Sequence, residues 1–219
     1  MYLGVIIMKR VVVSRLFNVL SDWEDAISTS TMLMIDKIRQ DNNIFVVMDN
    51  CHYKDVLFYD ISYPFIDYII ACNGSYVYDC KKKKVVFKKK LLLSTLKRIE
   101  KLNCKKLYYL EDKVVDEIDI NNDEVYKVDL IDYNDDINII NKLKINSFKH
   151  DNIIEINRMS KYEALTKLLK DKYDKKAIIS IGYDNSDKEV IKNSCGYLVK
   201  EGDNNNKIVE KILKEHFKY

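Results

Sequence analysis

Short apolar runs recur towards both ends of the chain and are separated by segments with helical spacing. The runs predict five core strands, at 10–14, 44–48, 67–72, 177–182 and 196–200. Between and after them, apolar residues repeat at three- and four-residue steps in the segments 31–40, 164–169 and 208–213, which predicts helices. Strands that alternate with helices indicate an α/β fold with a doubly wound, mostly parallel sheet.

Two of the helix starts carry a local signal. Ser160-x-x-Glu163 and Ser186-x-x-Glu189 both fit a capping box, in which the serine and glutamate side chains satisfy free backbone donors. We expect the second of these helices to end near Cys195 and Gly196, because glycine suits the position that follows a helix.

The stretch 77–150 breaks the alternation of strands and helices. It contains four lysines at 81–84, an amphipathic segment around 92–102, and the runs "KKLYYL" and "EVYKVDL", which are typical of antiparallel strands. We therefore predict a core domain formed by 1–76 and 151–219, with a small α+β cap domain, 77–150, inserted after the third core strand. The four lysines are interpreted as a hairpin turn at a solvated edge. The alternative, a nucleic-acid patch, lacks an aromatic stacking motif.

Composition excludes several classes of protein. Lys and Arg number 37 against 34 Asp and Glu, so a net charge of +3 does not by itself indicate a polyanionic partner. The five cysteines have no CxxC spacing, which argues against a disulfide framework or a zinc site. The apolar N-terminal run is interrupted by Lys9 and Arg10 and is too short to span a membrane. We expect a cytoplasmic protein with no nucleic-acid or membrane partner.

Polar residues follow several of the predicted strands. In an open α/β sheet, ligands bind beyond the carboxyl ends of the strands, where the strand order reverses. If the first strand neighbours the fourth, the residues there are 14–18 and 183–187, and Asp49 and Asn50 follow the second strand. Lys161 begins a capped helix, where the helix N-terminus favours an anion. These segments are the candidate site.

Three segments together resemble a known family. They are "ACNGSYVYD" with Asn73 and Gly74, "INRMSKYEAL" with Lys161, and "ISIGYDNSDKEVIKNSCGYLV" with Asp187. In this order and spacing they are similar to the Cof-type sugar-phosphate phosphatases of the haloacid dehalogenase (HAD) superfamily, over nearly the whole chain. The resemblance implies a HAD-like Rossmannoid core with a cap, a phosphorylated small molecule as ligand, Lys161 as a phosphate contact and Asp187 as a ligand of Mg²⁺.

The first strand departs from that family's pattern. The resemblance places Ser14 where the family has its nucleophilic aspartate and Leu16 where it has its acid/base aspartate, and Phe17 and Asn18 replace a small Gly-Thr pair. Tyr183 replaces the first acidic residue of the last motif. A single remaining carboxylate holds Mg²⁺ poorly, and leucine cannot supply a proton to a leaving group.

Three hypotheses remain open. The first is a catalytically degenerate HAD-like protein, a phosphometabolite-binding or interaction module without a cofactor, with Lys161, Asn50 and Asn18 as phosphate contacts. The second is a Mg²⁺-dependent phosphatase with a remodelled site, in which Asp49, Asp184 and Asp187 surround the metal and an activated Ser14 is the conceivable nucleophile. The third is a partner-binding protein whose cleft is filled by Phe17 and Tyr183. In simpler alternatives, Lys161 is an exposed lysine, Asp49 a polar loop residue, and Ser186 and Asp187 are helix-capping and loop-shaping residues.

Overall fold

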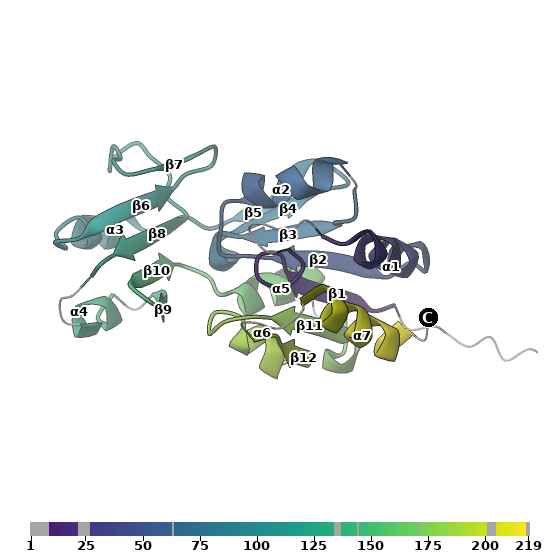
Figure 1. Cartoon of the computed structure of the whole chain (residues 1–219). Coiled ribbons are helices and arrows are strands. Elements are labelled where there is room, and N and C mark those ends of the chain that lie inside the picture. Colours follow the sequence, from purple (N-terminus) through teal and green to yellow (C-terminus); the bar gives the residue numbers. More distant parts are fainter. Residues whose placement is uncertain are drawn as a thin grey trace, which may run out of the picture.

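The chain forms two lobes, each built around its own sheet (Figure 1). A computed structural model describes residues 9–21, 27–62, 64–133, 137–143, 145–170, 172–200 and 205–217. The strand order is β12-β11-β1-β2-β3-β4-β5 in the larger sheet and β7-β6-β8-β10-β9 in the smaller one.

Five strands of the larger sheet run parallel, and they are the five that the apolar runs predict. They are β1 (Val11–Arg15), β2 (Ile44–Met48), β3 (Tyr68–Ala71), β11 (Ile178–Gly182) and β12 (Cys195–Leu198). β1 pairs with both β2 and β11, so the strand order reverses at β1. The predicted α/β fold class is therefore confirmed, and so is the neighbour relation on which the predicted site depends.

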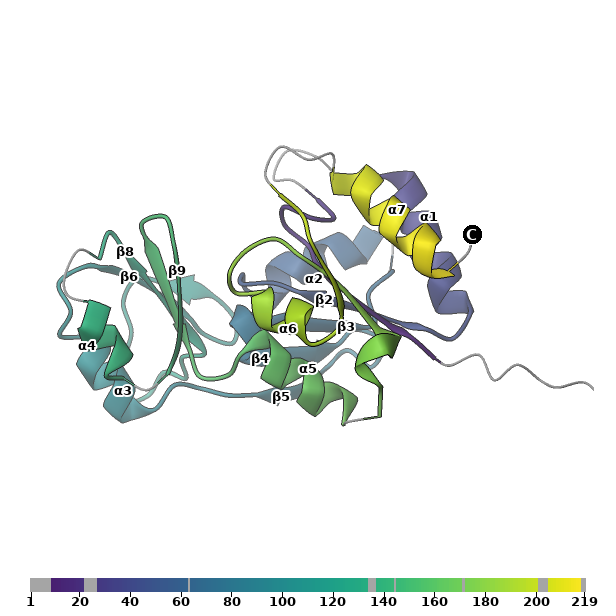
Figure 2. The same cartoon turned by 90° about the horizontal axis from the view of Figure 1, so that it is seen from below.

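Helices cover both faces of the larger sheet. Alternate residues of a strand face opposite sides, so Val11 and Val13 pack towards α5 and α6, whereas Val12 packs towards α1, α2 and α7. These helices are α1 (Thr29–Gln40), α2 (Tyr53–Ser62), α5 (Lys161–Leu169), α6 (Lys188–Lys192) and α7 (Asn205–Phe217). α1 and α7 lie side by side in both views (Figures 1 and 2). Each aliphatic side chain buried in this way stabilises the fold by about 1.5–3 kcal/mol.

The smaller lobe, called the cap below, is an antiparallel sheet with helices on one face. Its strands are β6 (Lys105–Tyr109), β7 (Val114–Val115), β8 (Lys127–Ile131), β9 (Asn146–His150) and β10 (Ile153–Asn157), and its helices are α3 (Leu93–Ile99) and α4 (Ile137–Asn141). Tyr108, Val128 and Ile154 belong to the apolar cluster of the cap. The residues that alternate with these along each strand, such as Lys127 and Glu155, lie on the opposite face of the sheet, and that face carries polar groups.

Sheet membership corrects the predicted boundaries of the insert, 77 and 150. β4 (Tyr76–Asp79) and β5 (Lys84–Lys88) pair antiparallel onto β3 and so extend the larger sheet, with the lysines 81–84 at the predicted hairpin turn. β10, which lies beyond residue 150, is a central strand of the cap sheet. The insert therefore runs between β5 and α5.

The predicted end of the helix near Cys195 and Gly196 is wrong. α6 ends at Lys192, and Cys195 and Gly196 open β12 instead. A Cβ atom at Gly196 would overlap the backbone of Ile191, so the glycine allows this strand to pass close to the helix.

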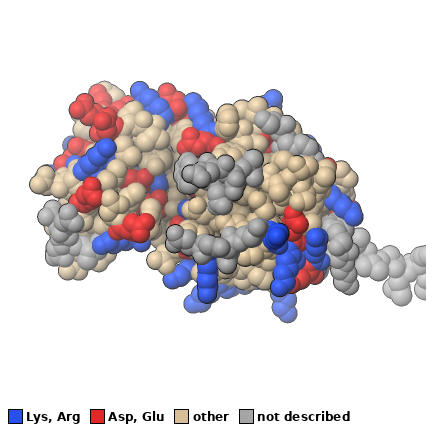
Figure 3. Space-filling view, in the orientation of Figure 1, with Lys and Arg blue, Asp and Glu red and all other residues tan. Residues whose placement is uncertain are grey.

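Charges on the surface are of both signs. On the face shown in Figure 3, acidic and basic side chains are scattered over both lobes, as in a solvated surface. Within the described ranges, no helix has the length and apolar character needed to cross a membrane.

Candidate functional site

Five charged side chains meet where β1, β2 and β11 end and α5 begins. Arg15 ends β1, Asp49 follows β2, Asp184 and Asp187 lie in the loop after β11, and Lys161 is the first residue of α5. These five residues are called the charge cluster below. Three carboxylates face two cations, which leaves one net negative charge.

Arg15 lies among the three carboxylates. Its Nη1 is 3.3 Å from Asp187 Oδ2 and also pairs with Asp184, and its Nε is 3.9 Å from Asp49 Oδ2. Burial alone would lower the pKa of Arg15, but the carboxylates Asp49, Asp187 and Asp184 outweigh it and raise that pKa. The Cζ of the Arg15 guanidinium also lies 5.9 Å from the ring centre of Tyr183. Arg15 therefore stays charged.

Arg15 lies in the candidate segment 14–18, but the sequence predicts no role for it. The available signal is a single basic residue at the end of an otherwise apolar run, "VVVSRLF". Such a residue is buried only when acidic partners reach it, because an unpaired charge in the interior is costly. Those partners come from the segments after β2 and β11.

Lys161 and Asp187 form a second ion pair, and neither has any exposed surface. Lys161 Nζ lies 2.5 Å from Asp187 Oδ1 and 2.8 Å from Ser186 Oγ. The other oxygen of Asp187 accepts a hydrogen bond of 2.8 Å from the backbone N–H of Tyr183. Burial would raise the pKa of Asp187, but Lys161 and Arg15 outweigh it and lower that pKa. The interpretation of Lys161 as an exposed lysine is therefore wrong.

The two capping boxes have different outcomes. The box at Ser160 and Glu163 forms as predicted and fixes the start of α5. The box at Ser186 and Glu189 does not form, because Asp187 occupies the N-cap position of α6 and its side chain makes no capping hydrogen bond. Ser186 Oγ lies 2.6 Å from Asp184 Oδ1 and 3.1 Å from Asn50 Oδ1. Neither side chain caps α6, whereas both make hydrogen bonds within the loop after β11, as loop-shaping residues do.

Two glycines allow the close approaches that build the cluster. Gly182 ends β11, and a Cβ atom there would lie 2.6 Å from the Cβ of Asp187. Gly74 has φ +105°, in the left-handed region, and any side chain there would overlap the carbonyl of Ser160. Gly74 thereby lets the short turn Cys72–Gly74 (η1) pack against the start of α5.

Ser14 and Leu16, for which the resemblance implies the two catalytic positions, are both buried. Ser14 is fully buried, and its hydroxyl donates a hydrogen bond of 3.0 Å to the carbonyl of Arg15. Leu16 is fully buried in the apolar cluster of the larger lobe. His52, the histidine nearest in sequence, contacts the carbonyl of Leu110 in the cap at 3.1 Å.

Phe17 and Asn18 also have other surroundings than expected. The ring of Phe17 packs edge-on against Tyr59, 5.6 Å away, within the same apolar cluster. Asn18 has a positive φ of 64°, and its carbonyl accepts a hydrogen bond of 3.0 Å from Asn205 at the start of α7. Of the predicted site residues, the structure brings Asp49, Asn50, Lys161, Asp184 and Asp187 together.

Asp49 holds the loops that follow β1 and β2. Its carboxylate accepts hydrogen bonds from the backbone N–H groups of Phe17, at 3.0 Å, and of Asn50, at 2.7 Å. Asn50 then links the charge cluster to the cap. Its side-chain oxygen contacts Ser186, and its carbonyl accepts a hydrogen bond of 2.8 Å from Lys127 Nζ.

On the cap side, Lys127, Asp129 and Glu155 form a buried group that the sequence did not indicate, here called the cap network. Lys127 Nζ lies 2.7 Å from Glu155 Oε1 and 3.1 Å from Asp129 Oδ1. Burial would raise the pKa of Glu155, but Lys127 and a hydrogen bond from His150 lower it to about 2. Burial raises the pKa of Asp129 and outweighs the opposing effect of Lys127. The Nδ2 of Asn73 in the larger lobe also donates to Glu155, at 3.1 Å.

A cavity of about 320 Å³ opens onto the charge cluster. It lies between the cap and the loop after β11, and its lining consists of Phe148, Lys149, His150, Asp151, Glu155, Asp184, Asn185 and Ser186. The side chain of Asp184 is 21% exposed, whereas that of Arg15 is 8% exposed. Asp184 is therefore the member of the cluster that a ligand in this cavity meets first.

Mg²⁺ does not fit the cluster as it is arranged. The ion needs an octahedron of oxygen ligands, and three carboxylates converge here. However, Arg15 already lies against all three, and both oxygens of Asp187 bond to Lys161, Tyr183 or Arg15. Among the described residues, no group of three His, Cys, Asp or Glu side chains is placed to hold a metal ion.

Comparisons with known proteins find relatives by structure and not by sequence. No protein-family model and no curated protein sequence matches the chain. A HAD superfamily phosphatase, BT1666 from Bacteroides thetaiotaomicron, has a TM-score of 0.80 at 14% identity, with 96% of each chain covered. The HAD subclass IIB sugar phosphatase BT4131 has a TM-score of 0.74 at 11% identity, covering 92% of this chain and 91% of that one.

A third similar structure is a haloacid dehalogenase-like hydrolase from Bacteroides thetaiotaomicron. Its TM-score is 0.68 at 16% identity, with 93% of this chain and 99% of that chain covered. The TM-scores show a shared fold, but at identities this low the chemistry of the site has to be judged from its own residues. The chain therefore has the fold of the HAD superfamily phosphatases, cap included, as the resemblance in its sequence implies.

Proposed function

We propose that this protein is a non-hydrolytic version of the HAD fold, which binds a phosphorylated metabolite or a partner and does not turn it over. One observation carries the proposal: the guanidinium of Arg15 lies among Asp49, Asp184 and Asp187, where it neutralises the carboxylates that a metal ion would need. Unlike a bound metal ion, the guanidinium of an arginine side chain cannot coordinate the oxygen of a substrate or of water.

The surrounding residues also argue against hydrolysis. Phosphoryl transfer depends on placing a nucleophile in line and neutralising the phosphoryl oxygens. Ser14 is fully buried, with its hydroxyl donating to a backbone carbonyl, and Leu16 offers no proton. The two cations of the cluster are already paired with carboxylates.

A phosphorylated ligand would reach the charge cluster at Asp184. The cluster carries a net negative charge, so a phosphate must first displace a carboxylate. Asp184 is the exposed partner of Arg15 and lines the 320 Å³ cavity. We infer that phosphate takes the place of Asp184 on Arg15, with Lys161 and Asn50 close by. Asn18 is a weaker candidate for a phosphate contact, because its carbonyl bonds to Asn205 at the start of α7. The sugar phosphatase among the similar structures supports a ligand of this class.

The alternative is a Mg²⁺-dependent phosphatase with a remodelled site. It is favoured by the convergence of Asp49, Asp184 and Asp187 on one point, and it requires that Arg15 leave that point. The two functions differ in one measurable respect, which is metal-dependent turnover.

The deciding experiment is hydrolysis of an aryl phosphate with and without Mg²⁺. The proteins are the wild type, Asp187→Asn in the cluster, and Asp116→Asn at an exposed aspartate of the cap as the matched control. We expect the same background rate from all three proteins. Mg²⁺-dependent turnover that Asp187→Asn abolishes and Asp116→Asn preserves would instead establish the phosphatase.

Binding is tested separately with inorganic phosphate and a hexose phosphate, by calorimetry. Asp184→Asn removes the competing charge from Arg15, so we expect it to bind phosphate about tenfold more tightly than the wild type. If neither protein binds either probe, the phosphate part of the proposal is wrong and a protein partner becomes the better explanation.

A further inference from the structure

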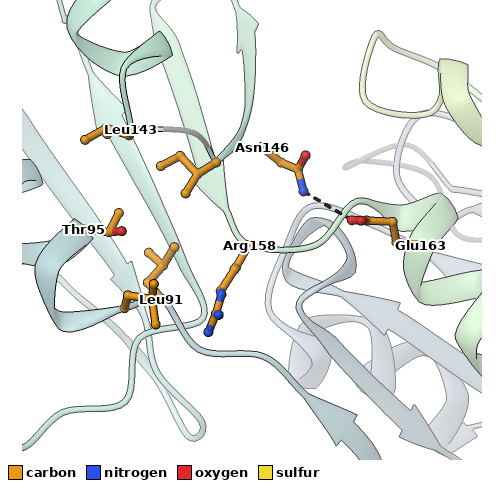
Figure 4. A pocket seen from close by; sticks show the side chains of 8 residues that line it. Leu91, Thr95, Leu143, Asn146, Arg158 and Glu163 are labelled. Atoms are coloured by element: carbon orange, nitrogen blue, oxygen red, sulfur yellow. Dashed lines mark hydrogen bonds between the residues drawn. The ribbon is translucent and has the colours of Figure 1, made fainter.

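A second cavity, of about 500 Å³, lies between the cap and α5 (Figure 4). Its lining consists of Leu91, Leu92, Thr95, Leu143, Ile145, Asn146, Arg158 and Glu163. Its volume falls in the range of small-molecule sites. It is separate from the charge cluster, because Lys161 and Glu163 are two residues apart on α5 and so face different sides of that helix.

One side of this cavity is aliphatic and belongs to the cap. Leu91 and Leu143 are nearly buried members of the cap's apolar cluster, whereas Leu92 is 48% exposed. In Figure 4 the Arg158 side chain extends towards Leu91, and Asn146 and Glu163 lie together at the other side. Arg158 and Glu163 thus lie apart from each other along the cavity, and aliphatic side chains of the lining lie beside them.

Arg158 has no acidic partner among the described residues. Within the part of the chain that the structure describes, no carboxylate lies within 4.0 Å of its guanidinium, in contrast to Arg15 and Arg39. Its Nη1 makes a long contact of 3.4 Å with the carbonyl of Lys90. An arginine presents several donors in a planar fork that suits a carboxylate, so these donors are available to a ligand.

Glu163 supplies the opposite charge. One of its oxygens accepts a hydrogen bond of 2.7 Å from the backbone N–H of Ser160 as part of the capping box. Glu163 is nevertheless exposed, and Asn146 lies beside it. This end of the cavity therefore favours a donor group or a cation and repels a second anion.

We propose that this cavity binds a small aliphatic carboxylate that carries an amino group at its far end. The carboxylate pairs with Arg158, the aliphatic body lies along the leucines and Ile145, and the amino group faces Glu163 and Asn146. The site needs nothing from the charge cluster, so the proposal stands whether or not the protein hydrolyses phosphate.

The test is calorimetric titration with three probes of similar length: ω-aminohexanoate, hexanoate and hexylamine. We expect ω-aminohexanoate to bind most tightly. Arg158→Gln should weaken its binding about tenfold or more, because a hydrogen-bonded charge pair is lost. The matched control is Arg98→Gln, since Arg98 also contacts a carbonyl at 3.4 Å, that of Lys142, but does not line the cavity.

Glu163→Gln tests the other end and keeps the capping box, because glutamine also serves at that position. It should reduce the preference for ω-aminohexanoate over hexanoate and leave the affinity for hexanoate unchanged or higher. The proposal is overturned if no probe shows saturable binding at millimolar concentration, or if Arg158→Gln binds ω-aminohexanoate as the wild type does.

Discussion

Arg15 and Asp187 are joined by an ion pair of 3.3 Å, although 172 residues separate them in the chain. Arg15 ends strand β1, and Asp187 is completely buried at the end of the loop after β11. The pairing follows from the parallel register of β1 and β11, which brings the ends of the two strands to the same edge of the sheet. It makes Arg15 a structural cation of the larger lobe.

Arg15→Ala should destabilise the protein by about 3–5 kcal/mol, since it leaves buried carboxylates without their partner. Arg39→Ala removes an ion pair with Asp67 that is partly exposed, and should cost at most about 1 kcal/mol. Urea unfolding of the two variants and the wild type gives both values.

The same variant tests whether Arg15 stands in for a metal ion. Without Arg15, three carboxylates face Lys161 alone, so Mg²⁺ should raise the melting temperature of Arg15→Ala and leave that of the wild type unchanged. An equal response of both proteins to Mg²⁺ would show that the guanidinium does not compete with the ion.

Leu16→Asp should not restore acid/base chemistry and should instead unfold much of the protein. Leu16 is fully buried in the apolar cluster, so the change removes apolar packing and buries an unpaired polar group. We expect a loss above about 4 kcal/mol. Leu33→Asp is the control, because Leu33 is 58% exposed and its replacement should cost less than about 1 kcal/mol. A stable Leu16→Asp protein would contradict this account of the site.

The sequence predicts the larger lobe well, because apolar runs mark strands that are buried on both faces, as in β1 and β2. It also predicts that Asp49 and Asp187 approach each other, since parallel strands end at one edge. It does not predict the role of Arg15, because a basic residue after a strand is equally compatible with solvent.

The cap network could not be predicted from the sequence, because it depends on the register of two strands. Lys127 and Glu155 meet because β8 and β10 pair antiparallel, with Glu155 opposite Asp129. A shift of one residue in that register would turn each side chain to the other face of the sheet. Neither residue type nor spacing reveals such a register. The capping pattern at Ser186 fails for a related reason: the pattern is local, and the hydroxyl of Ser186 bonds instead to Asn50 and Asp184.

Lys127→Met should cost about 3–5 kcal/mol, because Asp129 and Glu155 would keep their burial and lose their cation. It should also loosen the contact of the cap with the larger lobe, since Lys127 donates to the carbonyl of Asn50. Hydrogen exchange at the backbone amides around Asn50 measures that effect. Lys90→Met, which breaks an exposed pair with Glu124, should change neither the stability nor the exchange appreciably. Equal effects of the two variants would contradict the prediction.

Glu155 should make stability depend on acid pH. Its pKa falls from the ordinary 4.5 to about 2 in the folded protein. Between these values the unfolded chain takes up a proton that the folded protein does not, so the contribution is present above about pH 4.5 and is lost as the pH falls towards 2. Glu155→Gln should therefore flatten the decline in unfolding free energy between about pH 5 and pH 3.

Asp129 provides a control of opposite sign in the same network. Its pKa is raised in the folded protein, so the folded state takes up a proton more readily than the unfolded chain, and this group favours folding as the pH falls. Asp129→Asn should remove that gain and make the decline towards pH 3 steeper than in the wild type. Urea unfolding of both variants across this range measures the two slopes. If the two variants change the slope in the same direction, the buried charges around Lys127 are not arranged as described.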